Sequence, residues 1–366
     1  MNGIETSPVF VRTRNTPFLV AGPCSAESPA QLAAVAQALE TQGIDILRAG
    51  VWKPRTRPGG FQGNGVESLK WLQDVRTATG VMVSTEVANA SHVELALSHG
   101  IDVLWIGART TVNPFLVQEI ADALRGVSIP VMVKNPVNPD LRLWLGGVER
   151  LEAAGLTDIA LVHRGFSFFN HKKYRNSPIW QIPIDMRTER PDLMLLCDIS
   201  HIAGSRALLA DVAQIAMDLA YDGLMVEVHP EPDQALSDAA QQITPASFRQ
   251  LIDGLHIRNR QLDVQAVHPD IDRLRREIDR LDDRLLQVLA ERMHLVRNIG
   301  DIKNEHDIAI LQPERWRRIL ERAVQQGTGN ALTAEFIEEL FKAIHQESIH
   351  HQLDVMNPRP EKPPTS

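Results

Sequence analysis

Basic residues cluster in the stretch RAGVWKPRTRPGGFQG, which runs from Arg48 to Gly63. Its prolines and paired glycines can continue neither a strand nor a helix, so the stretch predicts a shaped loop. Cations held this close together repel one another unless an anion lies between them, and a guanidinium fork matches phosphate or carboxylate. The loop therefore predicts a site for phosphorylated substrates. For the loop considered alone, a solvated basic turn is the alternative.

Short apolar runs place this loop and other polar residues at regular positions. From Pro17 to about Leu255 we count eight runs, each followed by a polar break and a helical stretch. The runs are FLVAGPC from Phe18, DILRAGV from Asp45, VMVSTEV from Val81, VLWIGA from Val103, PVMVKNP from Pro130, IALVHRG from Ile159, LMLLCDISH from Leu193 and GLMVEVHP from Gly223. Ser28 and Asn113 are expected to cap the helices that follow them. Eight buried strands with intervening helices predict an α/β fold, a (β/α)8 TIM barrel.

Charged or reactive residues end each run, at the edge where barrels of this type build their active sites. The cations exceed what one phosphate needs, which indicates two anionic substrates; they are Arg48, Lys53, Arg55, Arg109, Lys134 and Arg164. The same edge is expected to carry Glu86, His163, Asp198 and His229.

A second set of residues offers a thiol, an imidazole and carboxylates. It consists of Cys24, His201 and Glu227, with Asp233 or Asp238 as a further carboxylate. Such a mixture suits a borderline divalent transition metal rather than magnesium. The other cysteine, Cys197, is expected to be an apolar core residue, because strand alternation turns it away from Asp198.

Eight motifs in the barrel region resemble those of the 3-deoxy-D-arabino-heptulosonate 7-phosphate (DAHP) synthases, in the branch shared with the 3-deoxy-manno-octulosonate 8-phosphate synthases. They are GPCSAES at Gly22, RAGVWKPRT at Arg48, STEV at Ser84, GAR at Gly107, VKNP at Val133, HRG at His163, DISH at Asp198 and VEVHPEPDQALSD at Val226. The resemblance implies a divalent metal, Mn²⁺ or a similar transition metal, bound by Cys24, His201, Glu227 and Asp238, which leaves Asp233 less favoured.

The same resemblance implies two substrates. Phosphoenolpyruvate contacts fall on Lys53, Arg109, Lys134 and Arg164, with Arg48 nearby, and erythrose 4-phosphate meets the KPRT motif, including Arg55 and Thr56. The octulosonate enzymes carry an Asn-Arg-Ser type sequence there, so KPRT argues against their sugar, arabinose 5-phosphate. The RPGG that follows KPRT departs from the Ser-Pro-Tyr of many relatives.

The sequence changes character after Leu255. We expect the barrel domain over residues 1–262, a linker at about 256–269, an all-helical domain over 270–354 and a disordered tail over 355–366. Apolar residues recur at helical spacing from Asp270 to about His306, and shorter helices are expected at 313–326 and 333–352. A helix of roughly 35 residues spans about 50 Å. Two short helices cannot cover it, so a homodimer through this domain is expected.

Cations interrupt the apolar stripe of the long helix. Arg292 lies about 20° from the Leu285 row, and Lys303 lies about 20° from Arg292. Cations rarely occupy such positions without an anion to meet. Arg275 points about 100° away from Arg292 and could serve only the neighbouring chain's pocket. A dimerising coiled coil with snorkelling cations is the alternative.

The helical region resembles the all-helical chorismate mutases. The motifs are IDRLRREIDRLDDRLLQVLAERMHLVRNIGDIK, then PER, then ELFKAIHQESIHHQ. The resemblance implies a site made of Arg275 from the partner chain with Arg292, Lys303, Arg315, Ser348 and Gln352. Arginines would clamp the carboxylates of chorismate, and Lys303 and Gln352 would stabilise charge on the breaking ether oxygen as prephenate forms. Gln312 and Trp316 depart from the acidic residues often found there.

Composition limits the remaining possibilities. The chain has 366 residues, 43% of them apolar, and a formal charge of -8 without a basic domain, which argues against nucleic acid as a partner. No run could cross a bilayer and no signal peptide is evident, so a cytoplasmic protein is expected. The two resemblances together imply a bifunctional enzyme of aromatic amino-acid biosynthesis, with prephenate or chorismate expected to inhibit the barrel through the helical domain. The alternative makes the helical unit a non-catalytic module for dimerisation and effector binding.

Overall fold

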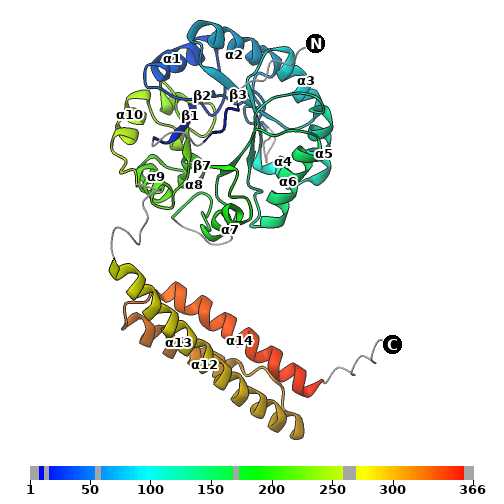
Figure 1. Ribbon diagram of the computed structural model, residues 1–366, viewed down its shortest axis with the longest axis vertical. Coiled ribbons are helices and arrows are strands. Elements are labelled where there is room, and N and C mark those ends of the chain that lie inside the picture. Colours follow the sequence, from blue (N-terminus) through cyan, green and yellow to red (C-terminus); the bar gives the residue numbers. More distant parts are fainter. Residues whose placement is uncertain (1–7, 12–15, 54–58, 168–172, 259–268, 358–366) are drawn as a thin grey trace. The chain divides into compact units, whose positions relative to one another are not determined.

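The computed structural model describes residues 8–11, 16–53, 59–167, 173–258 and 269–357. The chain forms two compact units, Met1–Arg260 and Gln261–Ser366. Figure 1 shows the first unit as strands enclosed by a ring of helices and the second as a bundle of helices. Among the described residues, no helix combines the length and the apolar character needed to cross a membrane.

The first unit is a closed barrel of eight parallel strands in sequence order, in which β8 pairs back onto β1. The strands are β1 (Phe18–Gly22), β2 (Ile46–Arg48), β3 (Met82–Val87), β4 (Val103–Ile106), β5 (Val131–Lys134), β6 (Ile159–His163), β7 (Met194–Asp198) and β8 (Gly223–Glu227). The barrel predicted from the eight apolar runs is confirmed. Helices cover the outside of the strands, which is why the runs are apolar on both faces.

Helices follow the strands around the barrel. They are α1 (Pro29–Glu40), α2 (Val66–Thr79), α3 (Ala90–Ser98), α4 (Ala108–Thr111), α5 (Pro114–Ala123), α6 (Leu141–Ala153), α7 (Gln181–Glu189), α8 (Ile199–Ala203), α9 (Leu209–Asp218) and α10 (Pro245–Asp253), with 3-10 turns η1 (Arg206–Leu208), η2 (Pro232–Gln234) and η3 (Ala239–Gln241). The Ser28 side chain accepts a hydrogen bond from Gln31 N, and that of Asn113 accepts one from Phe115 N. Both predicted caps are therefore confirmed.

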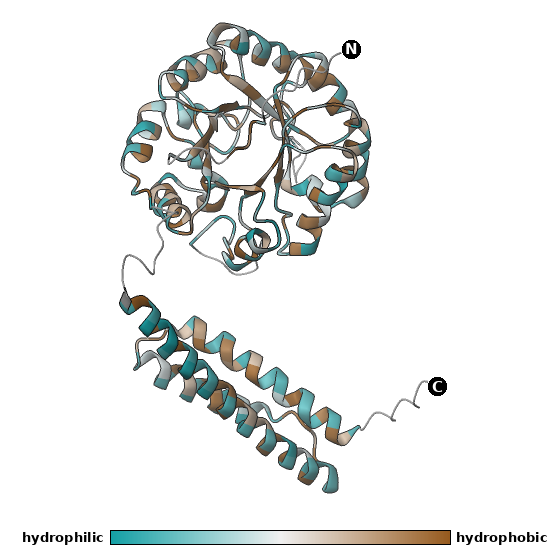
Figure 2. Cartoon of the chain, viewed as in Figure 1, coloured by the Kyte–Doolittle hydropathy of each residue, from teal (hydrophilic) through white to brown (hydrophobic). Residues whose placement is uncertain are grey.

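Two apolar cores stabilise the barrel, one inside the strands and one between the strands and the helices. Successive residues of a strand face opposite sides, so Ile46 packs inside the barrel and Leu47 packs outside it. Cys197 is buried in the outer core, as predicted. Figure 2 shows the apolar colouring of the strands and the mixed colouring of the helices around them.

One predicted strand ends earlier than its apolar run. The run from Leu193 was expected to continue to His201, but β7 ends at Asp198 and α8 begins at Ile199. The Asp198 side chain accepts a hydrogen bond from His201 N at 3.2 Å and so caps α8. His201 therefore lies on a short helix at the barrel mouth.

The second unit consists of α12 (Pro269–Glu305), α13 (Pro313–Thr328) and α14 (Ala334–Met356), with α14 packed against both of the others. Helix α14 includes two residues of the tail that was expected to be disordered, Val355 and Met356, which corrects that prediction. A Cβ placed on Gly300 would lie 3.5 Å from Val355 Cβ, so the last turn of α14 still packs against α12. Residues 358–366 of the tail lie outside the described residues.

Candidate active sites

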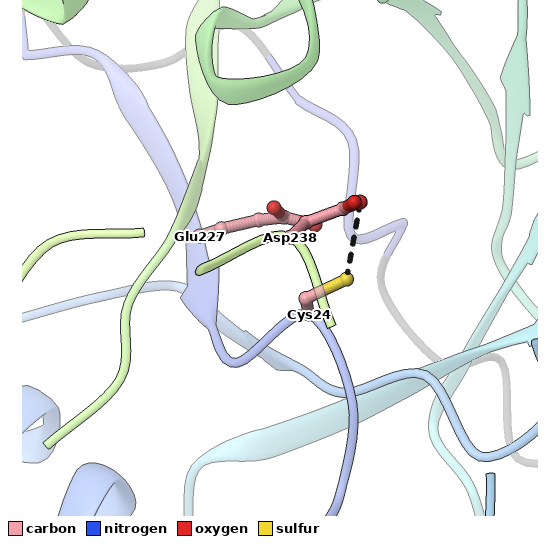
Figure 3. A group of neighbouring side chains, drawn as sticks. All are labelled: Cys24, Glu227 and Asp238. Atoms are coloured by element: carbon pink, nitrogen blue, oxygen red, sulfur yellow. Dashed lines mark hydrogen bonds between the residues drawn. The ribbon is translucent and has the colours of Figure 1, made fainter. Parts of the chain in front are cut away.

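Three potential metal ligands meet at the mouth of the barrel. Cys24 lies in the loop after β1, Glu227 ends β8, and Asp238 immediately precedes η3. One ligand atom from each lies within 4.8 Å of the others, and Cys24 Sγ is 3.6 Å from Asp238 Oδ2 (Figure 3). Asp233 instead is 84% exposed and pairs with Arg206. Of the two aspartates considered from the sequence, Asp238 is the one beside Cys24.

The charges of this group suit a divalent cation. Burial and the Glu227 carboxylate raise the pKa of the Cys24 thiol to about 11. Burial opposes ionisation of Glu227, but His201 and Arg48 outweigh it and lower the pKa of that carboxyl. Glu227 Oε1 is buried and forms an ion pair with Arg48 at 3.2 Å, but it accepts no hydrogen bond from the described residues. A divalent cation would supply a further partner for this oxygen and stabilise Cys24 as a thiolate.

His201 lies beside the same group. Its Nδ1 donates a hydrogen bond to Asp198 Oδ1 at 3.0 Å, because a carboxylate can only accept. The lone pair is then on Nε2, which lies 3.8 Å from Glu227 Oε1. A carboxylate that fixes the tautomer in this way is typical of histidine ligands to metals.

Cations line the mouth next to the metal group. Lys53 Nζ donates to Cys24 Sγ at 3.1 Å, and Lys134 Nζ donates to Asp198 Oδ2 at 2.7 Å. Arg48 is 1% exposed and lies 3.2 Å from Glu227 Oε1 through Nη2, while its Nε and Nη1 have no hydrogen-bond partner among the described residues. A buried guanidinium with two free donors is a ready site for an anion.

Arg164 and Arg109 extend the cationic lining. Burial, together with the charges of Arg175 and Arg109, lowers the pKa of Arg164 to about 10. Arg109 is exposed on α4. The guanidinium groups of Arg164 and Arg109 are close enough to repel each other, which indicates a second binding position for an anion. Arg55 and Thr56, the other predicted contacts of the phosphorylated sugar, lie outside the described residues.

Not every charged residue at the strand ends faces the mouth. His163 Nε2 donates to Pro178 O at 2.7 Å, and Tyr221 donates to His163 Nδ1 at 3.0 Å, so His163 belongs to a buried aromatic cluster. Two other residues expected at this edge have protein partners: His229 Nε2 lies 3.4 Å from Glu27 Oε2, and Glu86 accepts a hydrogen bond from Trp105 Nε1. For His163 the expectation from the sequence is wrong, because alternation along β6 turns it away from Arg164.

A polar group is buried in the helical unit. Arg292 Nη1 donates to Ser348 Oγ at 2.6 Å, and Lys303 Nζ donates to Ile310 O at 2.6 Å. Burial lowers the pKa of both cations. Gln352 is buried, and its Oε1 has no partner among the described residues. The structure thus places Arg292 beside Ser348 and buries the side chains of Lys303 and Gln352.

Two arginines predicted from the sequence lie apart from this polar group. Arg275 is exposed and pairs with Asp272 Oδ1 at 3.5 Å; seventeen residues separate it from Arg292, about 26 Å along a helix. Arg315 is exposed on the first turn of α13. Trp316 packs against His345 with the ring centroids 4.1 Å apart and the planes tilted by 36°, and burial and Arg292 lower the pKa of His345. The departure at Trp316 therefore adds an aromatic surface near Arg292.

Comparison with known proteins covers both units. Residues 6–258 match the model of the DAHP synthetase I family, and residues 274–353 match that of chorismate mutase type II. The phospho-2-dehydro-3-deoxyheptonate aldolase of Thermotoga maritima is 32% identical over 234 residues, which are 64% of this chain and 67% of that protein. The chain belongs to the DAHP synthetase I family.

Other relatives match the barrel unit. The 2-dehydro-3-deoxyphosphooctonate aldolase of Syntrophotalea carbinolica is 30% identical over 249 residues, which are 62% of this chain and 84% of that protein. A crystal structure of the Thermotoga maritima DAHP synthase aligns with a TM-score of 0.60 and 31% identity, covering 65% of this chain and 68% of that one. The chain is thus a bifunctional enzyme that joins a DAHP synthase domain to a chorismate mutase domain.

Sequence reasoning missed residues that support the DAHP synthase site. Gln241 Nε2 donates to Glu227 Oε2 at 2.6 Å, and Gln242 Oε1 accepts from Cys24 N at 3.0 Å. Arg175 Nη1 lies 3.0 Å from Asp238 Oδ1. The glutamines closely follow the ALSD motif, which was the available signal. Arg175 lies well beyond the end of β6, and nothing in the sequence indicated that it would reach the site.

Proposed function

We propose that the barrel condenses phosphoenolpyruvate with erythrose 4-phosphate to give DAHP and phosphate, and that the helical domain converts chorismate to prephenate. The observation that carries the first proposal is the ligand group of Cys24, Glu227 and Asp238 beside a buried, partly unpaired Arg48. A site for a borderline divalent cation next to an anion site is what an aldehyde and a phosphorylated enol need. Cys24, His201, Glu227 and Asp238 would hold Mn²⁺ or a similar ion.

In the barrel, the cations hold two mutually repelling anions in reacting order. Lys53, Arg109, Lys134 and Arg164, with Arg48, would bind phosphoenolpyruvate, and the KPRT loop would bind the four-carbon sugar phosphate. The bound metal ion would act as a Lewis acid towards the aldehyde oxygen. Carbon 3 of phosphoenolpyruvate then attacks the aldehyde carbon, water adds at carbon 2, and phosphate leaves by cleavage of its C–O bond. The orientation supplied by the cations is worth several kcal/mol.

In the helical domain, catalysis would rest on electrostatics alone. Arg292 would bind one carboxylate of chorismate, with Arg315 and the partner chain's copy of the exposed arginine at position 275 at the remaining anionic groups. Lys303 and Gln352 are buried and can donate to the ether oxygen as its bond breaks. No nucleophile is needed for this rearrangement.

A second copy of the chain would complete the helical domain. Its described apolar side chains are poorly buried: only Val296, Ala323 and Ile337 fall below a tenth exposed. Leu281, Leu285 and Leu295 of α12 are each more than half exposed. A domain with so small a core gains its stability from a partner, and a homodimer would also bring in the second chain's position 275.

The helical domain would also regulate the barrel. Prephenate and chorismate are later products of the same pathway, and a ligand can inhibit the barrel if it binds one arrangement of the two units better than another. We infer that occupation of the helical site by prephenate or chorismate slows the synthase.

One set of assays on the full-length protein tests the proposed activities. Phosphoenolpyruvate is supplied with erythrose 4-phosphate or with arabinose 5-phosphate, and chorismate is supplied alone. We expect phosphate release with the four-carbon sugar and prephenate formation from chorismate. Turnover with arabinose 5-phosphate only would overturn the sugar assignment. A failure to form prephenate would favour the helical unit as a non-catalytic module for dimerisation and effector binding, an alternative that the departures at Gln312 and Trp316 support.

A further inference from the structure

The segment Tyr174–Ser177 follows β6 and is held beside α8 by its backbone. Arg175 N donates to Ile202 O of α8 at 3.1 Å. Phe166 and Ser177 exchange two main-chain hydrogen bonds of 2.8 and 2.9 Å. The position of this segment is therefore set independently of its side chains.

Two glycines allow the segment to approach so closely. A Cβ on Gly165 would lie 2.8 Å from Asn176 O, and a Cβ on Gly204 would overlap the Cβ of Arg175. Both glycines also have positive φ angles, +75° and +68°, which other residues rarely adopt. Any larger residue at either position would displace Arg175 and Asn176 from the mouth.

Arg175 contacts the proposed metal ligands directly and through one intermediary. Its Nη1 lies 3.0 Å from Asp238 Oδ1 and donates to Gln241 Oε1 at 2.6 Å. Gln241 in turn donates to Glu227 Oε2 at 2.6 Å. Asp238 has a φ of +48°, which is unfavourable for a residue other than glycine, so its conformation needs support from its surroundings.

Asn176 contacts the anion-binding side of the mouth. Its Oδ1 accepts a hydrogen bond from Arg164 Nη1 at 2.7 Å, and its Nδ2 donates to His201 O at 2.6 Å. The Arg164 guanidinium is thus oriented by a neutral acceptor that leaves its charge available for a substrate. Neighbouring residues of one segment therefore reach both halves of the site.

We propose that Arg175 and Asn176 are positioning residues of the synthase: Arg175 holds Asp238 and Glu227 ready for the metal ion, and Asn176 holds Arg164 ready for phosphoenolpyruvate. The inference rests on the proposed function, which assigns the roles of Asp238, Glu227 and Arg164. Arg175 and Asn176 themselves are not proposed to contact the reacting atoms. Outer partners of metal ligands typically contribute 10- to 100-fold to metal affinity.

Binding of Mn²⁺ alone, measured by calorimetry on the full-length protein, tests the role of Arg175. Arg175→Ala should weaken Mn²⁺ binding by about 10- to 100-fold, and the near-ultraviolet thiolate band of the Co²⁺-loaded protein should shift as Asp238 reorients. At saturating Mn²⁺ the KM for phosphoenolpyruvate should change less than twofold. Arg125→Ala, which removes an exposed arginine paired with Asp122, serves as the matched control and should leave all three readouts unchanged.

Asn176→Ala should change the KM for phosphoenolpyruvate and leave the Mn²⁺ affinity nearly unchanged. Loss of a hydrogen bond to a charged group should raise the KM for phosphoenolpyruvate by about 10-fold, while Mn²⁺ affinity stays within about threefold. Wild-type Mn²⁺ affinity in Arg175→Ala together with a wild-type KM in Asn176→Ala would overturn the proposal.

Two further measurements keep the test decisive. If the circular dichroism spectrum shows that Arg175→Ala is unfolded, two other variants are measured in its place. Gly204→Ala displaces the Arg175 side chain, and Arg175→Lys keeps the charge but removes the guanidinium fork. Both should weaken Mn²⁺ binding, and unchanged binding in both would again overturn the proposal. If the wild-type protein itself binds no Mn²⁺ or forms no DAHP, the proposed function fails, whereas variants that match an active wild type defeat only this inference.

Discussion

The surroundings of Cys24 decide its chemistry. The thiol is 1% exposed, and burial together with Glu227 raises its pKa to about 11, although Lys53 donates to it at 3.1 Å. At neutral pH such a thiol is protonated and is a poor nucleophile. A divalent cation among Cys24, Glu227 and Asp238 would convert it to a thiolate, so this residue is better suited to metal binding than to covalent catalysis.

Replacement of Cys24 by serine should abolish tight metal binding. A lost thiolate ligand should cost more than the ~100-fold that outer partners can cost, because an alcohol is a weak ligand for a borderline metal. Calorimetry with Mn²⁺ and synthase assays before and after EDTA treatment measure the effect. Cys197→Ala, a change in the outer core, is the control and should retain metal binding. Full turnover by EDTA-treated, metal-free wild-type protein would contradict the ligand assignment.

Arg292→Ala should remove mutase activity and spare the barrel. Arg292 is half-buried and donates to Ser348 Oγ, and loss of one such donor from an electrostatic site costs on the order of 10²- to 10³-fold in rate. Prephenate formation and DAHP formation are measured on the same preparation. Arg297→Ala is the matched control, since Arg297 lies on α12 but pairs with His351 instead. An unchanged mutase rate in Arg292→Ala would show that the ligand binds elsewhere.

At the scale of one element, side chains alternate between the two faces at the end of β6, so His163 packs in the core while Arg164 reaches the proposed site. Arg164 lies at the mouth, whereas His163 is enclosed by Tyr221, Trp180 and Phe166. The neutral ring of His163 satisfies both of its partners, because Nε2–H donates to Pro178 O and Nδ1 accepts from Tyr221. Burial lowers the pKa of His163 to about 3.

This burial predicts acid sensitivity of the barrel. Between pH 6.5 and about 3 the unfolded chain protonates His163 and the folded chain does not. The free energy of unfolding should therefore fall as pH decreases below 6.5, by up to about 1.4 kcal/mol per pH unit. Between pH 7 and pH 5 the contribution of His163 is about 2 kcal/mol.

Urea unfolding at pH 7 and pH 5 measures this difference. His163→Gln retains a donor for Pro178 O but does not titrate, so it should be less stable at pH 7 and lose less stability at pH 5 than the wild type. His256→Gln, which replaces an exposed histidine of the barrel unit in the same way, serves as a control for nonspecific effects of pH. Equal losses in His163→Gln and wild type would exclude His163 as the cause.

At the scale of the whole molecule, two catalytic units share one chain. We expect a variant that ends after Asp263 to make DAHP but to be insensitive to prephenate, because the ligand's site is absent. The measurement is the synthase rate of the full-length and truncated proteins with and without prephenate. Full-length Arg292→Ala should be equally insensitive, which separates loss of the ligand site from loss of the domain. Equal inhibition of full-length and truncated protein would place the effector site in the barrel.

Local patterns were enough to predict much of the molecule. The eight strands, the caps at Ser28 and Asn113 and the long helix α12 each depend on residues close together in the chain. The edge that carries Cys24 and Glu227 also followed from the sequence, because parallel strands of a barrel end on one side. The resemblance then named Asp238, and its place beside Cys24 agrees with that choice.

The contacts made by loop residues could not be predicted, because they depend on how the loops fold in three dimensions. Chain position could not show that Asp233 pairs with Arg206 while Asp238 approaches Cys24, since both lie in one loop after β8. Nor could it show that Arg175, a residue of an irregular segment, reaches Asp238. Strand and helix periodicities report which face a residue takes, but a loop has no periodicity, and its side chains are placed only by the tertiary contacts that hold it.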